Sequence, residues 1–286
     1  VRNKDAVNQS YNIKVSGAGE AADYYISAGY TEQQSVLIGS SLDRYNIAMN
    51  VNTDIGKYIR TGISYKLTYQ ESDDAATFGI DEAASAPPWQ PIFDPNNRFG
   101  FAPVRTLYND AGEWQPFRRY GQQTRDNTVA FQHVNMQQFN LMRNMGQAYL
   151  EVEPIRGLVI RGALSMDYTY QQRVSFNDVL SAQFSVNAGN PADANPAGSY
   201  GNYELRTNKF YNYQADLIVS YAKSFGEHNV NALFSVQDQY FKNWTESFGT
   251  NNAQTRDRDR LGVAGSQGDI SGFSGRSQRF WYGYVG

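Results

Sequence analysis

Alternation of apolar and polar residues with a period of two is the feature that most constrains this chain. From Tyr45 to Val51, apolar side chains at odd positions alternate with Asn and Ala at even ones. Strong examples follow at 59–69, 158–170 and 211–221, and weaker ones lie at 11–16, 24–30, 142–152 and 230–240. Successive side chains of a β-strand point to opposite faces, so this period predicts strands with one apolar and one polar face. We expect about eight strands, several near the roughly ten residues that cross a bilayer at barrel tilt.

The links between these segments alternate strictly between short and long. The short links are Gly17–Ala22, Asp54–Lys57, Glu153–Gly157 and Ala222–His228, and the long ones cover roughly 31–43, 70–138, 171–206 and 241–275. In an antiparallel meander every second link lies at the same end, so all long links should share one end. A β-sandwich has no reason for this arrangement, whereas an outer-membrane barrel combines tight periplasmic turns with long extracellular loops.

Tyrosines support this orientation. With the short links in the periplasm, six tyrosines fall at the outer end of the apolar face: Tyr11, Tyr30, Tyr45, Tyr69, Tyr170 and Tyr211. Tyr24 and Tyr221 fall near the inner end, as a second aromatic girdle requires. Tyrosine also favours strands in general, but here the strand middles hold aliphatic residues instead. We therefore expect lipid to contact Ile63, Leu67, Leu164, Leu217 and Val219, and expect Ser64, Lys66, Ser165 and Asp216 to face the lumen.

Pairing in sequence order follows from the same interpretation. Segment 44–53 should pair with 58–70, 141–153 with 157–170, and 208–222 with 229–240, each antiparallel. The last stretch, Phe280–Gly286, looks like the opening of a further strand.

Composition excludes several classes of function. Aromatic residues make up 14% of the chain although its mean hydropathy is negative, as expected where apolar and polar residues alternate along strands. The net charge of −3 without a basic block gives no electrostatic support for a nucleic-acid partner. The absence of cysteine excludes disulfides, thiol chemistry and cysteine-based metal sites. No apolar stretch approaches the roughly 18 residues that a membrane-spanning helix needs.

Residues for catalysis are scarce. The only histidines, His133 and His228, are far apart in sequence, which disfavours a hydrolytic triad or a histidine metal site. The glycine-rich segment 262–268 lacks the strand and helix context of a phosphate loop, and the acidic pairs Asp73-Asp74 and Asp81-Glu82 lack calcium-loop spacing. We therefore expect no enzyme, no catalytic residues, no cofactor and no metal.

Five collinear segments resemble the SusC/RagA-type TonB-dependent transporters of Bacteroidota. Residues 9–30 (QSYNIKVSGAGEAADYYISAGY) resemble the family's N-Y-N-L-S-V-S-G-G-x-E hairpin. The other four, in the family's order, are Asp43–Asn46 (DRYN), Ala86–Pro95 (APPWQPIFDP), Gly146–Leu158 (GQAYLEVEPIRGL) and Phe225–Leu233 (FGEHNVNAL).

This resemblance implies an all-β antiparallel meander, a partial segment of a large transmembrane barrel with long extracellular loops, in the outer membrane of a Gram-negative bacterium. Residues 1–286 would form part of the barrel domain, because plug, TonB box and closing strands have no counterpart here. The start, Val1–Asp5, also lacks the apolar core of a signal peptide. The parent would import oligosaccharides or peptides beneath a SusD-like lipoprotein lid, powered by TonB–ExbB–ExbD through the missing N-terminal part, surrounded by lipid and lipopolysaccharide.

Two sets of residues are candidates for binding. The long link 70–138 carries aromatic and cationic side chains that can stack on sugars or apolar peptide side chains, or can pack the loop on itself or on a lid: Trp89, Phe93, Phe101, Trp114, Phe117, Arg118 and Tyr120. The second set should face the lumen, where its members can bind substrate, contact the plug or simply meet water: Arg44, Asn46, Asn50, Arg60, Lys66, Arg161, Asp167 and Asp216. The competing interpretations are a secreted or surface β-sandwich that binds glycans as an adhesin, and a barrel lipase or protease.

Overall fold

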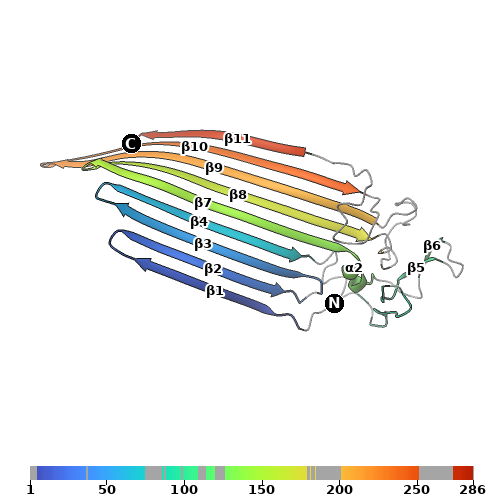
Figure 1. Cartoon of the computed structure of the whole chain (residues 1–286). Helices are drawn as coiled ribbons and strands as arrows, with labels where there is room; N and C mark the ends of the chain where they lie inside the picture. Colours follow the sequence, from blue (N-terminus) through green and yellow to red (C-terminus); the bar gives the residue numbers. More distant parts are fainter. Residues whose placement is uncertain are drawn as a thin grey trace.

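Nine antiparallel strands form a single sheet in the computed structural model of the chain (Figure 1). The structure describes residues 5–36, 38–74, 86, 88–97, 99–108, 114–119, 126–178, 181, 184, 201–250 and 273–285. The strands are β1 (Asn8–Ala18), β2 (Ala22–Gln34), β3 (Ser41–Ile55), β4 (Ile59–Asp73), β7 (Met136–Ile155), β8 (Leu158–Asp178), β9 (Gly201–Phe225), β10 (His228–Thr250) and β11 (Phe273–Val285). A separate hairpin pairs β5 (Arg105–Tyr108) with β6 (Trp114–Arg119), and the helix is α2 (Thr128–Val134).

Strand order in the sheet follows the chain, with β4 next to β7. Every neighbouring pair is antiparallel, so the predicted meander is confirmed. The three predicted pairings also occur, for instance Asn50 opposite Ser64 and Gln147 opposite Ser165. The ninth strand, β11, includes 280–285 of the stretch that the sequence marked as a strand opening, and Gly286 lies outside the described residues.

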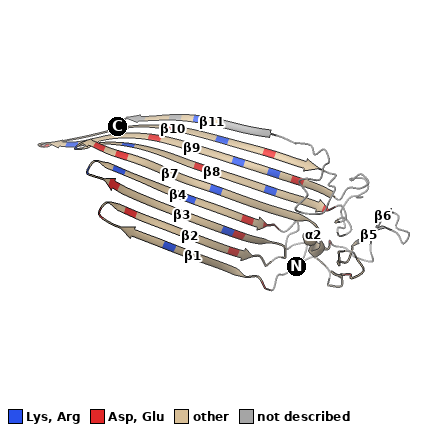
Figure 2. Cartoon of the chain, viewed as in Figure 1, with Lys and Arg blue, Asp and Glu red and all other residues tan. Residues whose placement is uncertain are grey.

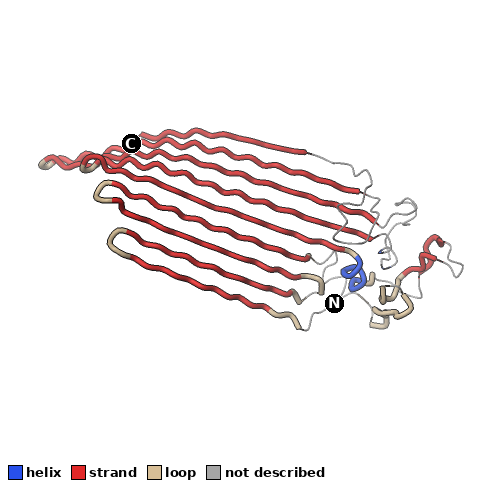
Figure 3. Tube along the Cα trace, viewed as in Figure 1, coloured by secondary structure: helices blue, strands red, loops and turns tan. Residues whose placement is uncertain are grey.

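Short turns lie at one end of the sheet and long links at the other (Figures 1 and 3). Gly56 and Gly157 occupy the β3–β4 and β7–β8 turns with φ of 70° and 90°, a left-handed backbone that glycine adopts without steric cost. The long links are shorter than predicted, because β8 continues to Asp178 and β9 already begins at Gly201. Strand pairing continues there although the apolar alternation has stopped, since backbone hydrogen bonds do not require one face to be apolar.

The nine-stranded sheet is one layer, and among the described residues no second sheet covers it. Ile63, Leu164 and Leu217 are 51%, 67% and 43% exposed, and Leu67 and Val219 are half-buried. Aliphatic side chains of a β-sandwich would be buried between its sheets. The single layer therefore contradicts the sandwich and supports an apolar face in contact with lipid. In the described part of the chain, no helix is both long and apolar enough to span a membrane.

Tyrosines form a row across the apolar face at the end with the long links. Tyr11, Tyr30, Tyr45 and Tyr69 pair in register across β1 to β4, and their ring centroids are 6.5, 5.0 and 6.3 Å apart in turn. Met142 pairs with Tyr69 on one side and with Tyr170 on the other, so Tyr170 belongs to the same row. The ring centroids of Tyr168 and Tyr211 are 4.8 Å apart. This row matches the outer girdle that the strand directions predicted.

Candidate functional site

The strand register gives the sheet two faces of different chemistry. Residues paired across antiparallel strands point to the same side, so each row of partners belongs to one face. One row runs Lys66–Met145–Asp167–Asn212 across β4, β7, β8 and β9. All eight polar candidates lie on this side, the polar face: Arg44, Asn46, Asn50, Arg60, Lys66, Arg161, Asp167 and Asp216. The opposite side, with Ile63 and Leu164, is the apolar face.

Ion pairs and ring contacts organise the polar face near the short turns. Arg60 lies 3.4 Å from Glu151 and 3.5 Å from Asp54. The Arg161 guanidinium lies 4.4 Å from the centroid of the Tyr149 ring. Each of these exposed contacts contributes little stability.

Further along the same face, the contacts are hydrogen bonds and one bidentate ion pair. Arg44 donates to Gln70 Oε1 at 2.9 and 3.2 Å. Arg143 donates to both carboxylate oxygens of Asp167, at 3.0 and 2.6 Å. Such charge-assisted pairs are the stronger hydrogen bonds of a protein surface.

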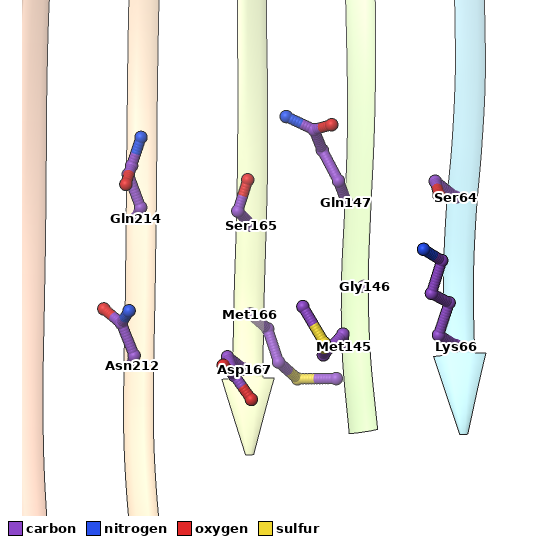
Figure 4. Close-up of a pocket in the computed structure, with 10 residues that line it drawn as sticks. All are labelled: Ser64, Lys66, Met145, Gly146, Gln147, Ser165, Met166, Asp167, Asn212 and Gln214. Carbon is purple, nitrogen blue, oxygen red and sulfur yellow. The ribbon is translucent and has the colours of Figure 1, made fainter. Parts of the chain in front are cut away.

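A shallow hollow of about 370 Å³ lies on the polar face between these networks. Figure 4 shows its side chains on four neighbouring strands, with hydroxyl and amide groups beside one ammonium and one carboxylate. The polar lining consists of Ser64, Lys66, Gln147, Ser165, Asp167, Asn212 and Gln214. These groups can hydrogen-bond to hydroxyls, amides or carboxylates, and they favour no single ligand.

The long link between β4 and β7 has a hydrophobic core of its own. Buried side chains of α2, notably Val129 and Phe131, pack with Phe101 and with Phe184 from the link between β8 and β9. Phe184 is fully buried, and its ring lies 6.3 Å from that of Phe101. Two links that are distant in sequence therefore share one core.

Asn127 joins the parts of this core. Its side-chain Nδ2 donates to the carbonyl oxygens of Ile92 and Ala102, both at 2.9 Å. Its Oδ1 accepts the backbone N–H of Ala130 as the N-cap of α2, and its own N–H donates to the Phe184 carbonyl at 2.8 Å. Asn127 is 4% exposed, so water does not compete for these bonds.

The loop candidates separate into exposed and buried residues. Trp89 and Phe93 are 71% and 68% exposed, and Ile92 between them is 41% exposed. We call these three the aromatic platform. Phe101, in contrast, is 8% exposed and packs against His133 and Phe93, so its ring belongs to the loop core. Trp114, Phe117 and Arg118 belong to β6, whose side chains the structure does not describe, and Tyr120 lies outside the described residues.

Sequence reasoning missed Asn127, Ile92 and Phe184. A signal existed for Asn127, because asparagine before the apolar run Val129–Phe131 is a common N-cap pattern. No local pattern marked Phe184. The sequence disfavoured a catalytic role for His133, and its ring packs at a tilt against Phe101 with the centroids 5.0 Å apart. The described residues contain no cluster suited to a metal ion.

Comparisons with known proteins agree with this geometry. No family model matches the chain. Two TonB-dependent receptors of Formosa agariphila, P39 and P26, are 25% and 22% identical over 82% and 85% of the chain, which is 20% and 22% of their own length. The chain thus spans about a fifth of these curated relatives.

Solved structures show the same fold at low sequence identity. The RagAB peptide transporter aligns over 97% of this chain and 29% of its own, with a TM-score of 0.65 and 14% identity. The ferripyoverdine receptor of Pseudomonas aeruginosa aligns over 97% and 32%, with a TM-score of 0.52 and 11% identity.

The antiparallel meander, with one apolar face and long links at one end, defines the chain as a segment of an outer-membrane β-barrel of a Gram-negative bacterium. Within this class, the chain is similar to TonB-dependent receptors and shares the fold of RagAB, in agreement with the resemblance to SusC/RagA-type transporters. These relatives are receptors and transporters rather than enzymes.

Proposed function

We propose that this chain forms part of the barrel wall of an active importer of oligosaccharides or peptides. Residues 1–286 would belong to a longer receptor whose plug and TonB box couple it to TonB–ExbB–ExbD, and a SusD-like lipoprotein would cover its outer mouth. The peptide-importing role of RagAB, whose barrel has the same fold, supports this proposal. The proposal also holds that the chain is not an enzyme.

The aromatic platform is the observation that carries the proposal. Trp89 and Phe93 are largely exposed and Ile92 is partly exposed, although all three sit on a loop with a packed core. An exposed apolar cluster held on a rigid support is typical of a contact surface. Its position at the end of the long links is extracellular in a barrel. There the platform would contact the substrate or the lid.

The polar face would then line the passage. The eight polar candidates and the hollow in Figure 4 would face the lumen, in contact with water, plug or substrate. Their many hydroxyl and amide groups suit a polar substrate that binds weakly at several places.

The test replaces the platform in the intact receptor. Trp89→Ala with Phe93→Ala should reduce substrate uptake at least tenfold while the barrel assembles normally, because both side chains are exposed and lie outside the strands. The matched control is Tyr58→Ala, an equally exposed aromatic (61%) in the β3–β4 turn at the opposite end. Normal uptake by the double variant would contradict the platform as a functional site.

Two further measurements separate its roles. Lower substrate affinity with an intact lid complex assigns the platform to substrate, whereas loss of co-purifying lipoprotein with unchanged affinity assigns it to the lid.

A further inference from the structure

A charged pair lies on the apolar face in the middle of strands β10 and β11. Arg279 donates to both carboxylate oxygens of Asp238, from Nε at 2.9 Å and from Nη2 at 2.6 Å. The row of partners that contains Asp238 is otherwise apolar: Ile63, Ala148, Leu164 and Ala215. Figure 2 marks the acidic and basic positions along these two strands. Both charges therefore face the membrane rather than the lumen.

The facing of Asp238 does not depend on β11. Strand β10 is held by β9, where Phe234 pairs with Val219 and Val236 pairs with Leu217. A slip of β10 by one residue would turn this apolar set toward the lumen. Asp238 therefore lies on the same membrane-facing side of β10 as Phe234 and Val236. An uncompensated carboxylate is energetically costly there, in contact with lipid.

Strand β11 carries apolar residues at positions of both parities, so its own alternation does not set its facing. Trp281 and Val285 pair with Asp238 and Phe234, which are membrane-side positions of β10. Phe280 and Tyr282 pair with Gln239 and Gln237, so they lie on the polar face, with their rings stacked at 6.3 Å. Arg279 lies on the membrane side instead. A one-residue slip would turn positions 280 and 282 outward but positions 281 and 285 inward, so hydrophobicity alone does not decide between the two registers. That slip would turn Arg279 inward and leave Asp238 unpaired in lipid.

We propose that the Asp238–Arg279 ion pair selects the register of β11 on β10, which the hydrophobic alternation of β11 leaves open. The pair compensates the charge that β10 brings to the membrane side, and the slipped register cannot do so. The pair is therefore a positioning device, and one consequence is that Phe280 and Tyr282 face the lumen. This inference requires the membrane location of the sheet and no particular substrate.

Engineered cysteine pairs can report the register, because the chain has no cysteine of its own. In the intact receptor in outer membranes, Val236→Cys with Gly283→Cys reports the observed register, in which the two residues are partners. Val236→Cys with Tyr282→Cys or with Tyr284→Cys reports the two one-residue slips. Oxidative cross-linking should give mainly the first product in the wild-type background.

The charge variants then test the cause. Arg279→Gln should reduce the first cross-link at least threefold, with the product moving to a slipped pair or with less assembled barrel. Asp238→Asn with Arg279→Gln should divide the product between the first cross-link and a slipped pair, since hydrophobicity does not distinguish the registers. The exchanged pair, Asp238→Arg with Arg279→Asp, should restore at least half of the first cross-link even if the single variant fails to assemble.

The matched control neutralises Arg143 and Asp167, a bidentate pair of similar geometry on the polar face, and should leave the register unchanged.

Two results would overturn the proposal. One is a neutral double variant that keeps the wild-type yield of the first cross-link. The other is an exchanged pair that behaves no better than Arg279→Gln alone.

Discussion

Gly62 shows how a single residue shapes the polar face near the short turns. A Cβ at this position would lie 2.4 Å from Asn52 Oδ1 and 2.5 Å from Tyr149 Cε1. The Tyr149 ring occupies this space, and its hydroxyl donates to Asn52 at 3.2 Å while Arg161 covers the ring. Glycine in a strand often marks such a close approach, here of a ring to the backbone.

We predict that Gly62→Ala destabilises the intact receptor by about 1–3 kcal/mol, because the added methyl group displaces Tyr149 and breaks its contacts. The measurement is the urea midpoint of the folded band on semi-native gels. Gly162→Ala is the matched control, since nothing lies within 4 Å of a Cβ there, and its midpoint should change little. Equal midpoints for the two variants would disprove the packing role of Gly62.

At the scale of elements, the strands and the long loop depend on different forces. The strands β8 and β9 continue past the tyrosine row, where Phe176 and Tyr203 pair and are buried with Met136. The Asn135 side chain accepts the Asp178 N–H at 2.9 Å and ties α2 to this extension. The loop is therefore anchored to the paired ends of β8 and β9, and this anchoring fixes the position of the aromatic platform.

We predict that Asn127→Ala loosens the loop without affecting the sheet. The change removes an N-cap, worth about 1 kcal/mol, and leaves the buried Ala102 carbonyl without the Asn127 donor at about 1–3 kcal/mol. The Ile92 carbonyl loses the same donor but still accepts the Ala102 N–H. Hydrogen exchange of the α2 amides should accelerate at least tenfold while that of β8 stays unchanged. Asn46→Ala is the control, because Asn46 accepts one hydrogen bond from Thr68 on the polar face. Unchanged protection of α2 would refute the bridging role of Asn127.

The whole molecule, as described, is an open sheet with β1 and β11 at its edges. The backbone groups along those edges have no partner strand among the described residues. Lipid cannot satisfy such groups, so a spanning sheet must close into a barrel.

We therefore predict that residues 1–286 expressed alone do not insert as a stable membrane protein. The isolated chain should appear in the insoluble fraction without a heat-modifiable, protease-resistant band, whereas the intact receptor should show both. A compact, heat-modifiable species formed by the isolated chain in outer membranes would show that its two edges can be satisfied without further strands.

Local alternation was sufficient to determine most of the sheet. The period of two assigned each of the eight polar candidates to one face, and the pairing confirms that they share it. Alternating link lengths placed the long links at one end. The facing of each residue and the position of each link can be predicted locally, because the alternation within a strand sets its faces and the following turn sets its pairing with the next strand.

Only the tertiary structure showed which residues contact one another when they are far apart in the sequence. It buried Phe101 against Phe184, exposed Trp89 and Phe93, and joined Asn127 to Ile92, Ala102 and Phe184. It also turned Phe280 toward the polar face and Arg279 outward to Asp238, a choice that the alternation of β11 leaves open. Packing and ion pairing depend on which residues meet in space, and a period along one strand carries no information about the charge on the next.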